Sequence, residues 1–274
     1  MIGQRLRERL SASGHVARPI PRRAGDAELA EILGAADAVV NLAGEPVAQR
    51  WTEDAKKRIY DSRVEGTRHL VGAFSKLSRR PSVLVSASAV GYYGSRGDQI
   101  LTEASTPGSD FLAHVVVDWE EASQPAESLG IRVVRLRLGM VLGPGGALAK
   151  MLPPFRLGAG GRLGSGHQWM AWIHLEDAVN LILFALSYPA IRGAVNATAP
   201  HPVTNQEFTD RLASVLHRPA MFLVPAFALK LAMGEMAEVV LGSQRVLPTV
   251  AKSAGFRFQY PELQAALTDI LAPQ

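Results

Sequence analysis

The chain has 274 residues, of which 47% are hydrophobic and 20% charged, a composition typical of a globular protein that can bury one large core or a core plus a smaller module. The net charge is +4, but the basic residues are scattered rather than gathered into a stripe interleaved with aromatic side chains, which argues against a nucleic-acid surface. There is no cysteine, which excludes disulfides and thiolate catalysis, and no run approaches the roughly 18 apolar residues of a membrane span.

The first residues predict a helix. Ile2, Leu6 and Leu10 recur every four residues, and Gly14 follows where such a helix would stop. Charged residues occupy the other face. The chain therefore begins with an amphipathic helix that needs a surface to pack against.

The central part alternates strand-like runs with helical stretches. Strands are predicted at 36–44, 82–88, 131–143 and 193–198, and helices at 51–77, 110–130 and 175–189. Thr52 and Asp110 are the expected N-caps, while Pro125 should disturb the second helix and Pro189 should end the third. Strict alternation indicates parallel βαβ units, and the Val- and Leu-rich strands indicate a sheet covered on both faces. We expect an α/β fold with a Rossmann-type doubly wound parallel sheet.

From about residue 203 the pattern becomes mostly helical, with proline breaks at 219, 225, 248 and 261. This predicts a small, mostly helical C-terminal domain beside the sheet. We expect residues 1–150 and 175–200 to form the dinucleotide-binding domain, and residues 151–174 and 201–274 to form the substrate module.

A doubly wound sheet normally begins with a strand and a glycine-rich turn, and the helix that follows holds a pyrophosphate at its N-terminus. Here the helix starts at once, and Gly3 is the last remnant of that turn and a candidate cofactor contact. We expect the first strand to be missing through a late start site or a truncated gene. Because that strand is usually central, its loss leaves unpaired backbone on both sides. One hypothesis is therefore that the chain as given binds no dinucleotide.

Two short motifs point to a cofactor. Asn41, Leu42, Ala43 and Gly44 follow a strand at the edge where parallel sheets bind ligands, although they also fit a tight turn. The run Arg18–Arg23 follows an expected short second strand, made irregular by two prolines, and suits either a 2′-phosphate or a solvated basic loop. Its lack of an acidic residue favours NADP(H) over NAD(H), with Arg22 or Arg23 as the contacts.

The runs VVNLAGEPV, SASAVGYYG, MLPPFRLGAGGRLGSGHQWMAWIHLEDAVN and LGSQRVLP together resemble an atypical branch of the extended short-chain dehydrogenase/reductases. Its members are labelled epimerase family proteins and sometimes cell-division inhibitors. The resemblance spans residues 2 to about 271. It implies a Rossmann domain with a small C-terminal substrate domain, a nicotinamide dinucleotide site, NADP(H) as the cofactor and a substrate that is unknown. Within it, the residues at 41–44 are expected to contact the cofactor.

The resemblance also implies that a serine at the end of the strand at 82–88 holds the substrate. Ser88 lies four residues before Tyr92, and Ser86, its neighbour on the same strand face, is a candidate cofactor contact. The family's Tyr-x-x-x-Lys pair is absent, because no tyrosine here is followed four residues later by lysine. The register of the helix at 110–130 puts Leu112 and Val116 in its place, and neither can move a proton. Tyr92 or Tyr93 then either substitutes or merely packs under the loop.

Arg137 is either a cofactor or substrate contact or the partner of a carboxylate. The glycine-rich run 150–174 is expected to be a loop that ends in a strand and roofs the substrate pocket. Its candidate substrate contacts are Lys150, Arg156, His167, Gln168 and Trp169. His167 and His174 match no metal signature, and no metal is expected. Asp177 should cap the next helix or pair with an arginine.

Two functions remain open. The first is an NADP(H)-dependent oxidoreductase or epimerase-like enzyme that acts on a carbonyl or hydroxyl group of a small molecule. The second is a dinucleotide-binding sensor or regulatory protein with weak catalysis, which the missing Tyr-Lys pair favours. In either case we expect a cytoplasmic monomer or homodimer that engages neither nucleic acid nor membrane.

Overall fold

The computed structural model describes residues 1–21 and 24–272. Its main sheet has four parallel strands in the order β1-β2-β4-β9. These strands are β1 (Ala38–Asn41), β2 (Val83–Ala89), β4 (Arg132–Leu138) and β9 (Gly193–Ala197). Val40 pairs with Val85, and Val85 pairs with Val134, so the predicted strands run side by side in one direction. The Rossmann-type parallel sheet is confirmed.

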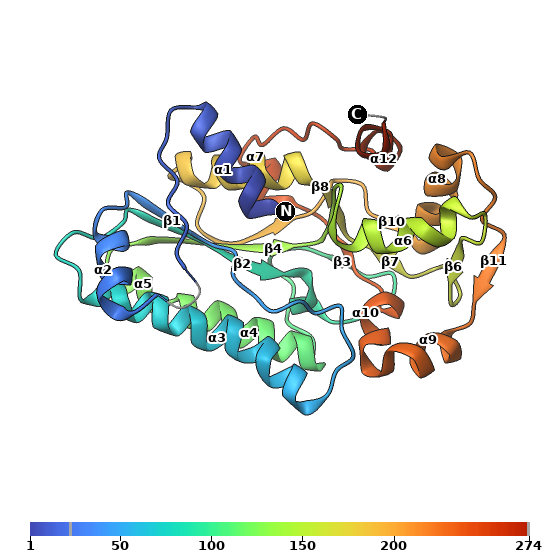
Figure 1. The fold of residues 1–274 in the computed structure, drawn as a ribbon, viewed down its shortest axis with the longest axis horizontal. Helices are drawn as coiled ribbons and strands as arrows, with labels where there is room; N and C mark the ends of the chain where they lie inside the picture. The colour runs from blue at the N-terminus through green and yellow to red at the C-terminus, as the bar shows by residue number, and fades with distance from the viewer. Residues whose placement is uncertain (22–23, 273–274) are drawn as a thin grey trace.

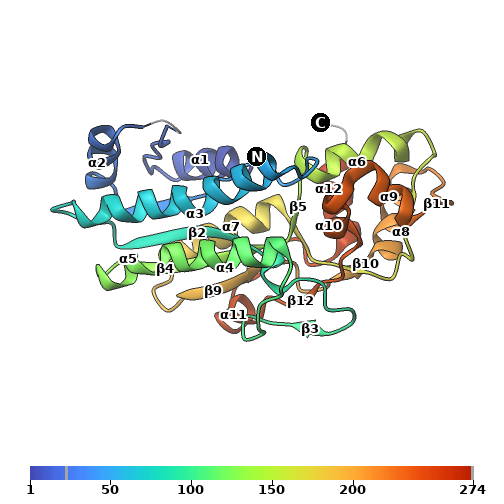
Figure 2. The same cartoon turned by 90° about the horizontal axis from the view of Figure 1, so that it is seen from below.

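Helices cover both faces of this sheet (Figures 1 and 2). One face carries α1 (Ile2–Ala12) and α7 (Leu175–Ser187), and the other carries α2 (Asp26–Gly34), α3 (Glu53–Ser75), α4 (Phe111–Ser123) and α5 (Pro125–Ser128). Successive strand residues point to opposite faces, so Val85 and Val134 join the core under α7, while Leu84 and Val133 join the core under α3. Double coverage explains the continuous apolar runs.

The predicted helix caps form. The Thr52 hydroxyl accepts a hydrogen bond from the Ala55 amide at 3.2 Å, and the Asp110 carboxylate accepts one from the Ala113 amide at 2.9 Å. The helical stretch 110–130 divides into α4 and α5 next to Pro125, as expected. A proline lacks an amide donor, so the chain ends one helix and restarts another there.

The N-terminal helix packs as its spacing predicts, with Leu6 buried against the α7 side of the sheet. The short second strand expected before Arg18 does not form: residues 15–21 lie outside helices and strands. Pro19 and Pro21 donate no backbone hydrogen bond, and β1 forms the edge of the described sheet, paired on one side with β2. The helix α2 was not anticipated from the sequence.

The strand predicted at 131–143 is interrupted at Gly139. Beyond it, β5 (Met140–Leu142) leaves the main sheet and pairs with β8 (Trp172–His174). A Cβ at position 139 would lie 2.7 Å from the carbonyl oxygen of Ala171, closer than real Cβ contacts come. Glycine therefore permits the close crossing that redirects the chain.

The loop expected from residue 150 begins instead inside a helix, α6 (Gly146–Arg156). Pro153 and Pro154 lie in its last turn, three and two residues before it ends at Arg156. Each proline removes the hydrogen bond that its amide would have donated to the carbonyl four residues earlier, but the preceding residues are good helix formers, and the helix ends at Arg156. The remainder of the run forms β6 (Gly161–Leu163), β7 (Trp169–Met170) and β8.

The C-terminal part is a small, mostly helical module, as predicted. It contains β10 (Val203–Thr204), α8 (Asn205–Leu216), β11 (Phe222–Val224), α9 (Ala226–Met233), η2 (Gly234–Met236), α10 (Ala237–Leu241), β12 (Arg245–Val246), α11 (Thr249–Ser253) and α12 (Leu263–Leu271). Asp177 neither caps α7 nor pairs with arginine; its carboxylate accepts the amides of Gln259 and Tyr260, at 2.7 and 2.9 Å, and so ties the module to α7. Within residues 1–21 and 24–272, none of the helices combines the length and apolar character needed to cross a membrane.

Candidate functional site

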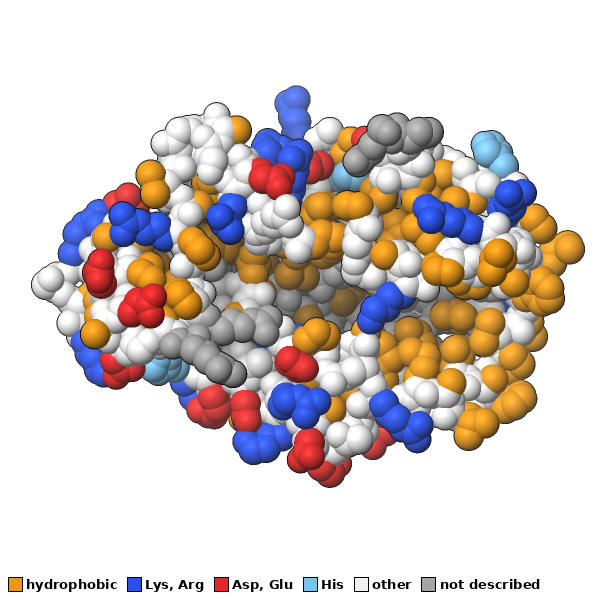
Figure 3. All heavy atoms as spheres, in the orientation of Figure 1, with side chains coloured by type: hydrophobic (Ala, Val, Ile, Leu, Met, Phe, Trp, Pro, Cys, Tyr) orange, Lys and Arg blue, Asp and Glu red, His pale blue; other side chains and the backbone are white. Residues whose placement is uncertain are grey.

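A large cavity lies between the sheet and the C-terminal module. Its volume is about 1690 Å³, and its walls come from the loop after β1, the end of β2, the start of α4, β5 and the segment 226–244. Figure 3 shows the molecule hollowed along its middle. Single ligand pockets usually enclose about 300–1,000 Å³. This cavity has room for two small molecules side by side.

The loop after β1 forms one end of the cavity. Leu42, Ala43 and Gly44 line it. Asn41 does not; its amide group donates to Thr67 at 3.0 Å and accepts from the Ala43 amide at 3.2 Å, which fixes the turn. Gly3 lies behind this loop, where an added Cβ would be 3.8 Å from the Leu42 side chain. The predicted motif therefore divides into lining residues and residues that support them.

Arg63 of α3 enters the same end of the cavity and was not anticipated. Its guanidinium donates to the carbonyls of Glu45 and Ile59, at 2.9 and 3.2 Å, and lies over the Trp119 ring. Burial lowers the pKa of Arg63. A Cβ at Gly44 would lie 3.1 Å from this guanidinium, so the two groups are in close contact. The sequence did contain a signal for it: Arg63 lies four residues after the buried Ile59, on the apolar face of the predicted helix.

Ser88 belongs to a buried charged cluster beneath the cavity. Its hydroxyl donates to Oε1 of Glu120 at 2.6 Å, and Arg137 donates to both oxygens of that carboxylate, at 2.7 and 2.8 Å. Burial opposes the charge of Arg137, but the hydrogen bonds and charge of Glu120 outweigh it and raise the pKa of Arg137. Of the two alternatives for Arg137, the structure has the carboxylate pair. Ser88 lines the cavity, and its hydroxyl proton is already used in the hydrogen bond to Glu120.

The two tyrosines lie around the same arginine. Tyr93 is fully buried; its hydroxyl donates to Asn196 at 2.7 Å and accepts from Arg137 at 3.0 Å. Burial is the main reason that the pKa of Tyr93 is raised. Tyr92 stacks on the Arg137 guanidinium, whose carbon is 3.4 Å from the ring centroid, and Tyr92 is not among the cavity residues. Tyr93 thus lines the cavity with its hydroxyl held by Asn196 and Arg137, while Tyr92 lies outside the lining.

Leu112 and Val116, the positions at which the sequence resemblance expects the family's tyrosine and lysine, do line the cavity. They pack against Gly91, where an added Cβ would meet Leu112 at 3.6 Å and Val116 at 3.9 Å. Ser86 is buried outside the lining, and its hydroxyl contacts the Ala87 carbonyl at 3.4 Å. The wall at this point is apolar.

The residues predicted to contact substrate separate into two groups. Lys150, Gln168 and Trp169 line the cavity. Arg156 and His167 are exposed and lie outside its lining. Arg22 and Arg23 lie outside the described residues, so the structure does not locate these two predicted contacts.

Comparisons with known proteins agree with this architecture. Residues 1–197 match the model of the NAD dependent epimerase/dehydratase family, and residues 224–270 match a domain of unknown function, DUF1731. The chain belongs to the NAD dependent epimerase/dehydratase family. The resemblance inferred from its motifs is confirmed.

Individual members of the family are similar over nearly the whole chain. The chloroplastic epimerase family protein SDR39U1 homolog of Arabidopsis thaliana is 44% identical, covering 98% of this chain and 84% of that protein. Epimerase family protein YfhF of Bacillus subtilis is 39% identical, with 99% and 95% covered. The crystal structure of human SDR39U1 isoform 2 with NADPH has a TM-score of 0.91 at 36% identity, with 98% and 95% covered.

A nucleoside-diphosphate sugar epimerase from Corynebacterium glutamicum has a TM-score of 0.79 at 33% identity. The matched region covers 99% of this chain but only 56% of the epimerase. Family membership thus accounts for the fold of the chain.

Proposed function

We propose that this chain binds NADP(H) in the cavity and acts on a carbonyl or hydroxyl group of a small molecule. The observation that carries the proposal is that the loop at 42–44 and the guanidinium of Arg63 face one cavity at the carboxyl ends of β1 and β2. The carboxylate of Glu45 lies toward Arg58 instead, at 3.8 Å. A half-buried guanidinium that holds only backbone carbonyls has donors left for a phosphate.

The shape of the cavity is compatible with a dinucleotide. Gly44 and Gly139 both line it, and at each of them a side chain would press on a neighbouring group. Such positions let a cofactor approach the backbone closely. The human relative was crystallised with NADPH, and the basic run at 18–23 suits a 2′-phosphate; both support NADP(H) over NAD(H).

A bound nicotinamide would supply or accept a hydride. The residues of this chain would bind and orient the partner molecule. The Ser88 hydroxyl donates its hydrogen bond to Glu120, so in the cavity it can accept a hydrogen bond but cannot donate one. Leu112 and Val116 present apolar side chains at the place where the resemblance expects the family's proton-transfer pair.

That apolar wall favours a second candidate function. An acid–base group typically contributes about 10²–10⁴-fold to a rate, and the cavity holds none where the family places it. A dinucleotide sensor or regulatory protein needs the binding site alone. The two functions differ in turnover rather than in cofactor affinity.

The first test is a fluorescence titration of the full chain with NADPH and with NADH. We expect tighter binding of NADPH. Arg63→Met should weaken it by roughly tenfold or more, because a hydrogen bond to a charged group is lost. The matched control is Arg68→Met on the same helix, whose guanidinium is exposed and pairs with Glu65, and this variant should bind as the wild type does.

Failure of NADPH to bind would contradict the proposal, and so would equal losses in the two variants. Following nicotinamide absorbance with a panel of carbonyl compounds then separates the candidates. Consumption of NADPH with any of them supports the oxidoreductase, whereas binding without consumption for every compound supports the sensor.

A further inference from the structure

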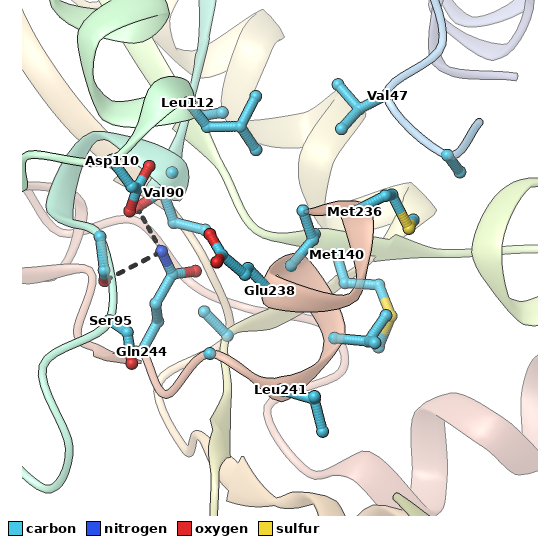
Figure 4. Close-up of a pocket in the computed structure, with 18 of the residues that line it drawn as sticks. Val47, Val90, Ser95, Asp110, Leu112, Met140, Met236, Glu238, Leu241 and Gln244 are labelled. Atoms are coloured by element: carbon cyan, nitrogen blue, oxygen red, sulfur yellow. Dashed lines mark hydrogen bonds between the residues drawn. The ribbon is translucent and has the colours of Figure 1, made fainter. Parts of the chain in front are cut away.

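Methionines gather on the side of the cavity formed by β5, α6, β7 and the segment 226–244. Five of the chain's seven methionines line the cavity, and we call them the methionine wall: Met140, Met151, Met170, Met233 and Met236. Figure 4 shows Met140 and Met236 facing the same space as Leu112, Val47 and Leu241. Methionine is flexible and polarizable, so such a wall adapts to apolar molecules of irregular shape.

The polar side chains on this side are occupied within the protein. The Gln168 amide donates to the carbonyls of Leu163 and Val240, at 3.0 and 3.3 Å. The Gln244 amide donates to Val90 and Gly94, at 3.0 and 3.2 Å (Figure 4).

Two further side chains of this side are also held within the protein. The Trp169 indole donates to Asp98 at 2.8 Å, and the Asn205 side chain accepts from the Leu163 amide at 2.7 Å. These donors hold the loops of the cavity together. They are not arranged for a polyhydroxylated ligand, which needs many free partners.

Apart from Arg63, which is assigned above to the cofactor, the cations that line the cavity are engaged within the protein or exposed, and Arg50 is among the exposed ones. The guanidinium of Arg96 donates to the carbonyls of Tyr93 and Pro107, at 3.1 and 2.7 Å. Lys150 and Lys230 line the cavity but are exposed, and the carboxylate of Glu238, on the same segment as Lys230, adds the opposite charge. The charges thus lie at the solvent side, while the methionines form the interior.

The helix α9 is almost entirely apolar but is not buried. Seven of the eight residues in its sequence AFALKLAM are apolar, yet none of them is buried. Leu229 and Met233 face the cavity, while Phe227 and Leu231 on the other side are 74% and 79% exposed. In Figure 3, hydrophobic side chains are concentrated on the lobe where Figure 1 draws α9 and β11. Exposed apolar surface next to a cavity marks a binding site.

We propose that the methionine wall and the inner face of α9 bind the apolar body of the substrate, an alkyl or hydrocarbon-ring alcohol or carbonyl compound, and not a nucleoside-diphosphate sugar. This inference rests on the proposed function, since the apolar molecule is taken to be the reaction partner of the dinucleotide. It gives the segment 224–270, which matches a domain of unknown function, the role of recognising the substrate.

The test uses the full chain with and without saturating NADPH, and Nile red as an uncharged apolar probe. We expect the dye to bind, 1-decanol to displace it and UDP-glucose not to displace it. Leu229→Ser should weaken dye binding by about tenfold, since the apolar contact between the dye and the leucine side chain is lost. The matched control is Leu231→Ser on the outer face of the same helix, which should leave binding within about twofold of the wild type. Met233→Gln gives a second cavity variant of similar size, and far-UV circular dichroism checks that all three fold.

Absence of dye binding, displacement by UDP-glucose, or equal losses in Leu229→Ser and Leu231→Ser would overturn the proposal. The cofactor site is judged separately by NADPH titration. If the dye binds as expected but NADPH does not, the proposed function fails and the apolar site remains. If NADPH binds but the dye does not, only the apolar site fails.

Discussion

At the scale of single residues, the cluster around Arg137 determines which hydrogen-bonding groups of the site are free for a ligand. Arg137 and Glu120 are both buried and are joined by two hydrogen bonds, and Ser88 adds a third bond to the carboxylate. A buried ion pair is costly to break, because the remaining charge loses both its partner and its water. The serine that the motif assigns to the substrate is therefore also part of an internal structural pair.

Removal of Glu120 should destabilise the protein strongly. We expect Glu120→Ala to lower the free energy of unfolding by about 3–5 kcal/mol, because Arg137 is left buried without a counter-ion. Glu121→Ala changes the exposed neighbour and should stay within about 0.5 kcal/mol of the wild type. Urea unfolding measures both. Equal effects of the two substitutions would mean that the charge of Arg137 is solvated in solution.

At the scale of elements, three helices meet at the start of α7. His174 precedes it, and Nδ1 of its ring accepts the Glu176 amide at 3.1 Å, so the proton of the neutral ring is on Nε2, 3.2 Å from Asp269 of α12. Glu176 in turn binds Arg5 and Arg9 of α1, at 2.5 and 3.0 Å. Protonation of Nδ1 would remove the cap that begins α7.

This arrangement predicts a loss of stability in mild acid. Burial, only partly offset by Asp269, lowers the pKa of His174, so below the ordinary histidine value the unfolded chain takes up the proton before the folded protein does. Stability should therefore fall as the pH decreases through about 6.5. His174→Asn keeps a capping oxygen but cannot be protonated, so the stability of this variant should fall less steeply with decreasing pH. The slopes of the wild type and the variant should differ by at most about 1.4 kcal/mol per pH unit.

Urea unfolding between pH 7.5 and 5.5 gives these slopes. His167→Asn, at an exposed histidine, serves as the control and should follow the wild type. A wild-type slope in His174→Asn would contradict the assignment of the acid sensitivity to this residue.

At the scale of the whole molecule, the sheet and the C-terminal module share one cavity. The loop after β1 and Arg63 line one part of it, and the segment 226–244 lines another. Asp177 joins the two parts through the backbone of Gln259 and Tyr260. A ligand that fills the cavity contacts both parts, so its binding should stabilise the protein as a unit.

NADPH at 100 times its dissociation constant should raise the free energy of unfolding by about 2.7 kcal/mol, by mass action. Arg68→Met should gain as much as the wild type at the same NADPH concentration, and Arg63→Met should gain clearly less. Unfolding curves with and without NADPH measure the gain. An equal increase in the free energy of unfolding for Arg63→Met and the wild type would mean that Arg63 does not contribute to NADPH binding.

The sequence by itself determined the local structure and the order of the main elements. The apolar runs around Val40, Val85 and Val134, separated by capped helices, required parallel strands whose carboxyl ends meet at one edge, because hydrophobic periodicity and chain direction are local properties. Where local signals conflicted, as at Pro153 in α6 or at the prolines near Arg18, the expectation failed, since neighbouring elements settle such choices.

Only the tertiary structure decided which side chains meet. Ser88 binds Glu120, 32 residues away, and Tyr93 binds Asn196, 103 residues away, so neither partner can be read from spacing along the chain. Arg63 and the methionine wall became one cavity only when segments distant in sequence packed together. The physical reason is that periodicity fixes the face on which a side chain lies, whereas packing between elements fixes what that face meets.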